Sequence, residues 1–235
     1  MRNRFMVLLL GASLLAVAAQ AGWEYTAVTK AEGGGRKAQM MGNSIKALVA
    51  GNQARGEFVE SANPMMSAGS YLLMQDAGKT MYMVNPQEKT YSTWDLKAMM
   101  GMAGGAMSMM NMQVKEPKVE KLLEEDGGKI LGYPTTHYRF RTSYSMEMSF
   151  MGMNQSSSVV KEEDIWATTA LKEAAFSFQG IGAEMKSGNE QLDRLIAAQK
   201  GKVTGFPLKM VHSQSTKDAR GQEQVMTTTM ESTTR

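Results

Sequence analysis

The sequence of 235 residues lacks cysteine altogether. No disulfide bond can therefore cross-link the chain, so its fold depends on a core of apolar side chains, which a chain of this length can form. The same absence leaves no cysteine to carry a lipid anchor. We expect a protein whose stability comes from packing alone.

Histidine is nearly as scarce, with only His137 and His212. Hydrolysis needs a nucleophile and a base positioned beside it, and His137 has no acidic neighbour in the sequence. The adjacent carboxylates Glu162-Glu163-Asp164 would point to alternating faces of a strand, so a solvated turn is the favoured interpretation. The glycine run at 33–35 lacks the Gly-Lys-Ser/Thr ending of a phosphate loop. The sequence therefore predicts a protein that is not an enzyme, with no catalytic residue and no cofactor.

Charge of either sign is in little excess. The chain has 26 Lys and Arg against 23 Asp and Glu, a formal net charge of +3. Binding to nucleic acid requires a clustered basic patch, and no segment of the sequence contains one. Nucleic acid is therefore excluded as a partner.

Long apolar runs are missing except near the start. Arg2 and Arg4 precede an apolar stretch at residues 5–19, and residues 19–21 (Ala-Gln-Ala) match the pattern at which signal peptides are cleaved. The stretch spans about 15 residues, short of the roughly 20 that a membrane-spanning helix needs. We predict a signal peptide at residues 1–21 and, after cleavage, a single periplasmic domain at residues 22–235 with no transmembrane anchor. Secretion is the alternative location, and a retained anchor is the alternative to cleavage.

Methionine, by contrast, is abundant. The chain has 24 methionines, and they fill seven of the fourteen positions from Met99 to Met112. A thioether side chain is apolar, polarizable and adaptable, so it suits variable apolar surfaces, and it also binds soft metal ions. Three glycines interrupt the run, each costing roughly 1 kcal/mol relative to alanine in a helix. We expect a frayed helix or mobile lid at about residues 94–113, with Ser92 or Thr93 as its cap.

Most of the remaining sequence alternates in the manner of antiparallel strands joined by tight turns. The expected strands cover residues 22–28, 44–49, 56–60, 71–74, 80–84, 89–92, 118–124, 129–133, 136–150, 157–168, 206–216 and 222–234. A hairpin turn is expected at Asp126-Gly127-Gly128. A second helix is expected at residues 189–200, with Ser187 and Glu190 at capping-box spacing.

The order of the motifs resembles an exported bacterial family of unknown function that is similar to the lipoprotein carriers (LolA-like fold). The segments that carry the resemblance are GSYLLMQDAGKTMYMVNPQEKTYSTWDLKAMM (69–100), KILGYPTTHYRFRTSYSMEM (129–148), EEDIWAT (162–168) and GFPLKMVHSQSTKDARGQEQ (205–224). The resemblance implies an α+β, mainly β fold, in which a strongly curved antiparallel sheet (half-barrel) wraps two or three helices around an apolar hollow for acyl chains.

In such a fold the Met-rich segment would close over the hollow. The expected lining residues are Met99, Met100, Met102, Met107, Met109, Met110, Tyr82, Met146 and Met148. We therefore expect a non-catalytic periplasmic binding protein for lipid-like or other apolar ligands, acting as a carrier or envelope sensor. One alternative is a periplasmic binder of Cu(I) or Ag(I), because methionines recur at spacing two on expected strands and place their sulfurs on one side. The second alternative is a structural or interaction protein that binds no small ligand, with an envelope protein as a possible partner.

Overall fold

The computed structural model describes residues 22–64, 66–75, 78, 80–150, 153–171, 190–199 and 203–234. Within these residues, eleven strands form one sheet. The strands of the first half are β1 (Trp23–Gly33), β2 (Asn43–Ala50), β3 (Gln53–Ser61), β4 (Tyr71–Gln75), β5 (Thr80–Asn85) and β6 (Thr90–Trp94). Those of the second half are β7 (Gln113–Ile130), β8 (Tyr133–Phe150), β9 (Met153–Thr168), β10 (Phe206–Asp218) and β11 (Glu223–Thr234). The helices are α1 (Arg36–Gln39), α2 (Leu96–Met109) and α3 (Glu190–Gln199).

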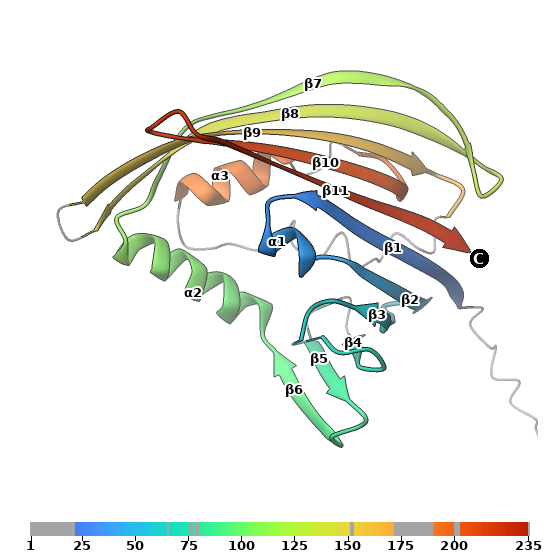
Figure 1. The fold of residues 1–235 in the computed structure, drawn as a ribbon. Coiled ribbons are helices and arrows are strands. Elements are labelled where there is room, and N and C mark those ends of the chain that lie inside the picture. Colours follow the sequence, from blue (N-terminus) through green and yellow to red (C-terminus); the bar gives the residue numbers. More distant parts are fainter. Residues whose placement is uncertain are drawn as a thin grey trace, which may run out of the picture.

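The sheet consists of two meanders that meet in its middle. Its strand order is β6-β5-β4-β3-β2-β1-β11-β10-β9-β8-β7, so the first and last strands of the chain are neighbours (Figure 1). That central pairing is antiparallel and aligns Thr29 with Met230. Every other neighbouring pair is antiparallel as well. The prediction of an antiparallel sheet is confirmed.

The main core lies on the inner face of the shorter strands and of β10. Its buried side chains are Tyr25, Ala27, Ala47, Val49, Ala54, Met74, Met81, Phe206 and Leu208. Trp23 stacks on Tyr25 with ring centroids 4.5 Å apart, and Phe206 meets both rings edge-on. A smaller cluster of Tyr138, Phe140 and Ala167 lies on β8 and β9. The sheet therefore builds its core mainly from its own curved face.

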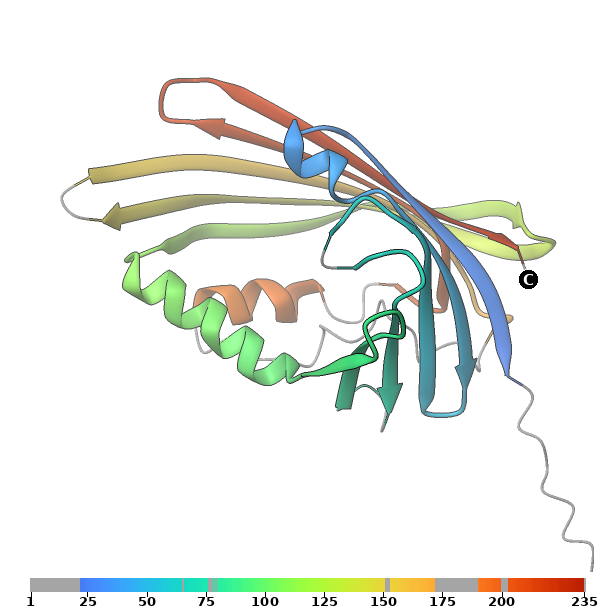
Figure 2. The same cartoon turned by 60° about the horizontal axis from the view of Figure 1, so that its bottom comes forward.

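This origin of the core corrects the predicted fold class. A sheet that wraps two or three helices is wrong, because helix is scarce and contributes little to the packing. α1 is a single turn of four residues, α3 has ten residues, and only α2 is longer, with 14. α3 packs on β7, whereas α2 makes few contacts with the described strands. Figure 2 shows α2 and α3 on the same side of the long strands β7–β9.

Two local predictions in the long strands are also wrong. The segment Asp126-Gly127-Gly128 is a register shift inside β7, and the chain turns instead at Leu131-Gly132. A Cβ atom on Gly127 would lie 2.6 Å from Thr135 Oγ1, so this glycine admits a close contact with β8. The carboxylates at 162–164 lie inside β9 and do not form a turn.

The predictions that remain concern the second helix, its cap and the signal peptide. The second predicted helix is confirmed as α3. Its proposed cap at Ser187 lies outside the described residues, as does the predicted signal peptide at residues 1–21. Among the described helices, none combines the length and the apolarity that a bilayer crossing requires.

Candidate functional site

Most of the Met-rich run, from Met99 to Met109, lies in the continuous helix α2. The residue that starts it is Asp95, whose Oδ1 accepts a hydrogen bond of 2.9 Å from the backbone N–H of Ala98. Aspartate is among the preferred N-cap residues because it satisfies a backbone donor left free in the first turn. The predicted caps, Ser92 and Thr93, lie in β6 instead. The helix then continues through Gly101, although a glycine inside a helix costs roughly 1 kcal/mol of stability relative to alanine.

Most of the surface of α2 faces solvent. Met99, Met102 and Met109 are 43%, 67% and 85% exposed. The half-buried positions are Met100, Met107 and the following Met110, and Gly104 is buried. From Ala98 to Val114 the chain contains no charged residue. An uncharged helical stretch is normally buried in a protein interior, whereas one side of α2 presents Met99, Met102 and Met109 to solvent.

The end of α2 is attached to the long strands. The backbone N–H of Ser149 in β8 donates to the carbonyl of Met110 at 3.3 Å. On the other side, the backbone N–H of Val114 donates to Gln191 Oε1 of α3 at 2.7 Å. These contacts hold the link between α2 and β7 at a defined place on the sheet.

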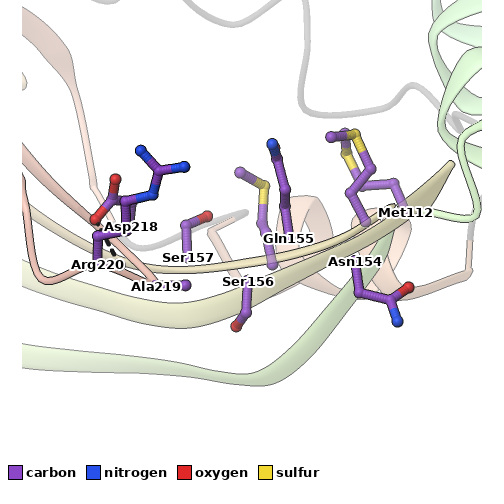
Figure 3. A pocket seen from close by; sticks show the side chains of 10 residues that line it. Met112, Asn154, Gln155, Ser156, Ser157, Asp218, Ala219 and Arg220 are labelled. Carbon is purple, nitrogen blue, oxygen red and sulfur yellow. Dashed lines mark hydrogen bonds between the residues drawn. The ribbon is translucent and has the colours of Figure 1, made fainter. Parts of the chain in front are cut away.

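Beyond this link, three methionines line one hollow of about 680 Å³. They are Met112, Met146 and Met148, which share the hollow with Gln155 and Ser157 of β9 and with the β10–β11 turn at Asp218–Arg220. In Figure 3, Met112 and Gln155 project to the same side of the strands, whereas Asn154 and Ser156 project to the other side. The predicted lining residues Met146 and Met148 are therefore grouped, with Met112 as a neighbour that the prediction omitted.

Tyr82 lies elsewhere. It belongs to β5 and alternates with Met81 and Met83, whose side chains are buried on the opposite face. Its ring is 6.1 Å from that of Tyr91, and both line a separate surface hollow of about 520 Å³ over β4–β6. The nine predicted lining residues are thus divided between α2 with the following Met110, the hollow beside β8 and the outer face of β5.

The structure also reveals acidic partners for His137. Its Nε2 lies 2.6 Å from Asp164 Oδ1 and its Nδ1 lies 3.4 Å from Glu125 Oε1. Arg139 Nε donates to the same Asp164 oxygen at 2.7 Å, and the imidazole stacks on the Trp166 ring at 4.2 Å. Both ring nitrogens are occupied and the residue is only 7% exposed. We interpret this cluster as a structural connection between β7, β8 and β9.

A second polar group lies on the inner face of the sheet. Glu163 Oε1 is 3.0 Å from His212 Nδ1 and 2.8 Å from Lys161 Nζ. Burial alone would raise the pKa of Glu163, but His212 and the positive charge of Lys161 outweigh burial and lower its pKa from 4.5 to about 2. Glu163 is therefore ionised at every physiological pH. Neither polar group was predicted, because each includes side chains from more than one strand.

Ligands for hard metal ions do not gather in the described part of the chain. No group of three or more His, Asp or Glu side chains there could hold an ion. In the hollow beside β8, the sulfurs of Met112, Met146 and Met148 are the soft ligands that the fold brings together.

Comparison with known proteins identifies a family. A family model described as a domain of unknown function, DUF4412, matches residues 37–233. The chain belongs to this family. The prediction of an uncharacterised family is confirmed. The DUF4412 match covers strands β2–β11 except the last residue of β11, and β1 lies before it. No curated protein and no solved structure matches the chain.

Proposed function

We propose that this DUF4412 protein is a non-catalytic binding protein for lipid-like apolar ligands, acting as a carrier or sensor in the periplasm. The observation that supports the proposal is the uncharged stretch of α2 after Lys97, from which Met99, Met102 and Met109 project into solvent. A contiguous exposed apolar patch on a protein marks a site of interaction. A helix that exposes methionines at this density is suited to ligands of variable shape, because the side chain is unbranched and adaptable.

The proposal rests on α2 and not on a carrier fold. The resemblance to lipoprotein carriers predicts the same class of ligand and stays a prediction. The location rests on the pattern of residues 1–21, in which two arginines precede an apolar stretch and a small-residue cleavage pattern.

Native mass spectrometry of the protein, isolated from periplasm without detergent, tests this function. We expect masses of co-purifying lipid or fatty acid that dissociate on collisional activation. A protein that carries no ligand and also fails to bind an added fatty acid would contradict the proposal and favour a structural role with a protein partner.

A further inference from the structure

Met112, Met146 and Met148 are brought together by the register of two strands. Met146 and Met148 are two residues apart on β8, so both side chains lie on one face. The β7–β8 ladder pairs Val114 with Met146 and Gln113 with Glu147. The same register places Met112, one residue before β7, level with Met148. All three side chains line the same hollow.

The spacing of these side chains fits a common ligand atom. Directly opposed residues of an antiparallel pair have Cβ atoms about 5 Å apart, and residues two apart on a strand are separated by roughly 7 Å. Each methionine has three rotatable bonds beyond its backbone, so the three sulfurs can converge on one point. The backbone N–H of Met112 also donates to the carbonyl of Met107 at 2.7 Å, which fixes the backbone at Met112.

The chemistry of the hollow selects a soft ion. Thioether sulfur is a soft, neutral ligand that prefers Cu(I) to Mg²⁺ or Ca²⁺. Figure 3 places Met112 at one end of the hollow, and Asp218 and Arg220 at the other. The Asp218 Oδ1 atom already accepts backbone hydrogen bonds from Arg220 and Gln222 at 2.9 Å and 2.8 Å. The methionine end therefore offers sulfur ligands that are half-buried and still open to solvent.

We propose that Met112, Met146 and Met148 form a binding site for a soft monovalent metal ion, Cu(I) or Ag(I). The site uses different residues from the exposed face of α2, so it neither requires nor excludes the binding of apolar ligands there. No oxidation or reduction takes place at the protein, because the ion binds in its monovalent state.

Silver nitrate, in chloride-free buffer, is the probe for this site. Isothermal titration and native mass spectrometry of the wild-type protein should show tight binding of about one Ag⁺ per chain. The variant Met112→Leu/Met146→Leu/Met148→Leu should lose that ion, because leucine keeps the apolar volume and removes the sulfur. The matched control is Met99→Leu/Met102→Leu/Met109→Leu, which removes three exposed sulfurs from α2 and should bind Ag⁺ as the wild type does.

A second measurement does not depend on folding of the variants. In wild-type protein labelled with ¹³C at the methionine methyl groups, Ag⁺ should shift the resonances of Met112, Met146 and Met148 together. The proposal would be overturned if the wild type did not bind Ag⁺, or if the triple variant at Met112, Met146 and Met148 bound it equally well. It would also be overturned if Ag⁺ shifted only the methyl resonances of other methionines. Anaerobic titration with Cu(I) should repeat the Ag⁺ result, and binding of Zn²⁺ at the same three sulfurs would contradict it.

Discussion

Replacement of the exposed methionines of α2 by glutamine should weaken the binding of apolar ligands. The variant Met99→Gln/Met102→Gln/Met109→Gln keeps side-chain length and helix propensity while it removes the apolar surface. The exposed fractions of the three residues, 43%, 67% and 85%, amount to about two full methionine side chains. Full burial of one such side chain is worth about 2 kcal/mol. A ligand that covers all three would therefore lose about 4 kcal/mol, or roughly a thousandfold in affinity.

Fluorescence titration with a dansyl-labelled fatty acid measures this loss. The matched control is Leu48→Gln/Leu122→Gln, which removes two exposed leucines, 45% and 43% exposed, from β2 and from the middle of β7. We expect the control to bind the probe as the wild type does. Equal affinity of the α2 variant and the wild type, with circular dichroism showing both folded, would refute the assignment of α2 as the contact surface.

Three further predictions concern stability. Because the pKa of Glu163 is lowered from 4.5 to about 2 in the folded state, its carboxylate stabilises the fold above pH 4.5 and this contribution disappears as the pH falls towards 2. Urea unfolding at pH 7 should show Glu163→Gln less stable by up to about 3 kcal/mol, with the difference narrowing towards pH 2; a difference independent of pH would contradict the ionic role. Gly105→Ala should raise the unfolding temperature, since alanine gains up to about 1 kcal/mol in a helix and nothing lies within 4 Å of the added Cβ. Gly127→Ala should lower the unfolding temperature, with a loss of about 1–3 kcal/mol in the free energy of unfolding. The added Cβ would lie 2.6 Å from Thr135 Oγ1 and 2.8 Å from Trp166 Cδ1. If Gly127→Ala were the more stable of the two glycine variants, the described packing would be contradicted.

The strands could be predicted because their pattern is local. Alternation of large and small or polar side chains is enough to place β4, β5 and β6 within one or two residues, and the turns between strands carry Gly, Pro, Asn or Asp. The pairing of β1 with β11 was beyond that pattern, since it joins residues about 200 positions apart. The pairing of β1 with β11 joins the two meanders into one sheet, and the strands of this sheet supply the core. Without that pairing, the prediction assigned much of the core to helices.

The errors at glycines have a similar origin. Asp126-Gly127-Gly128 has the composition of a hairpin turn. In the structure, Gly127 instead lies inside β7, where the lack of a side chain allows Thr135 and Trp166 to approach closely. Conversely, the glycines of the Met-rich run suggested a broken helix, and the chain forms α2 across them. The Asp95 cap could have been read from the sequence, because it immediately precedes the helix.

The site was only partly readable from the sequence. The alternation Met81-Tyr82-Met83 on one strand already places Tyr82 on the face opposite Met81 and Met83. The grouping of Met112 with Met148, and of His137 with Asp164, depends on the register between strands. Such register is set by tertiary packing and cannot be derived from a single local pattern.

Photo-crosslinking can show whether α2 is the surface that contacts apolar ligands. The full chain would be incubated with a fatty acid that carries a diazirine in its acyl chain, irradiated, digested and mapped by mass spectrometry. We expect the label to concentrate on peptides from Leu96–Met109 and to disappear when unlabelled fatty acid is present in excess. Label that is spread over the outer strands, or that is absent from α2 while bound elsewhere, would show that α2 is not the contact surface.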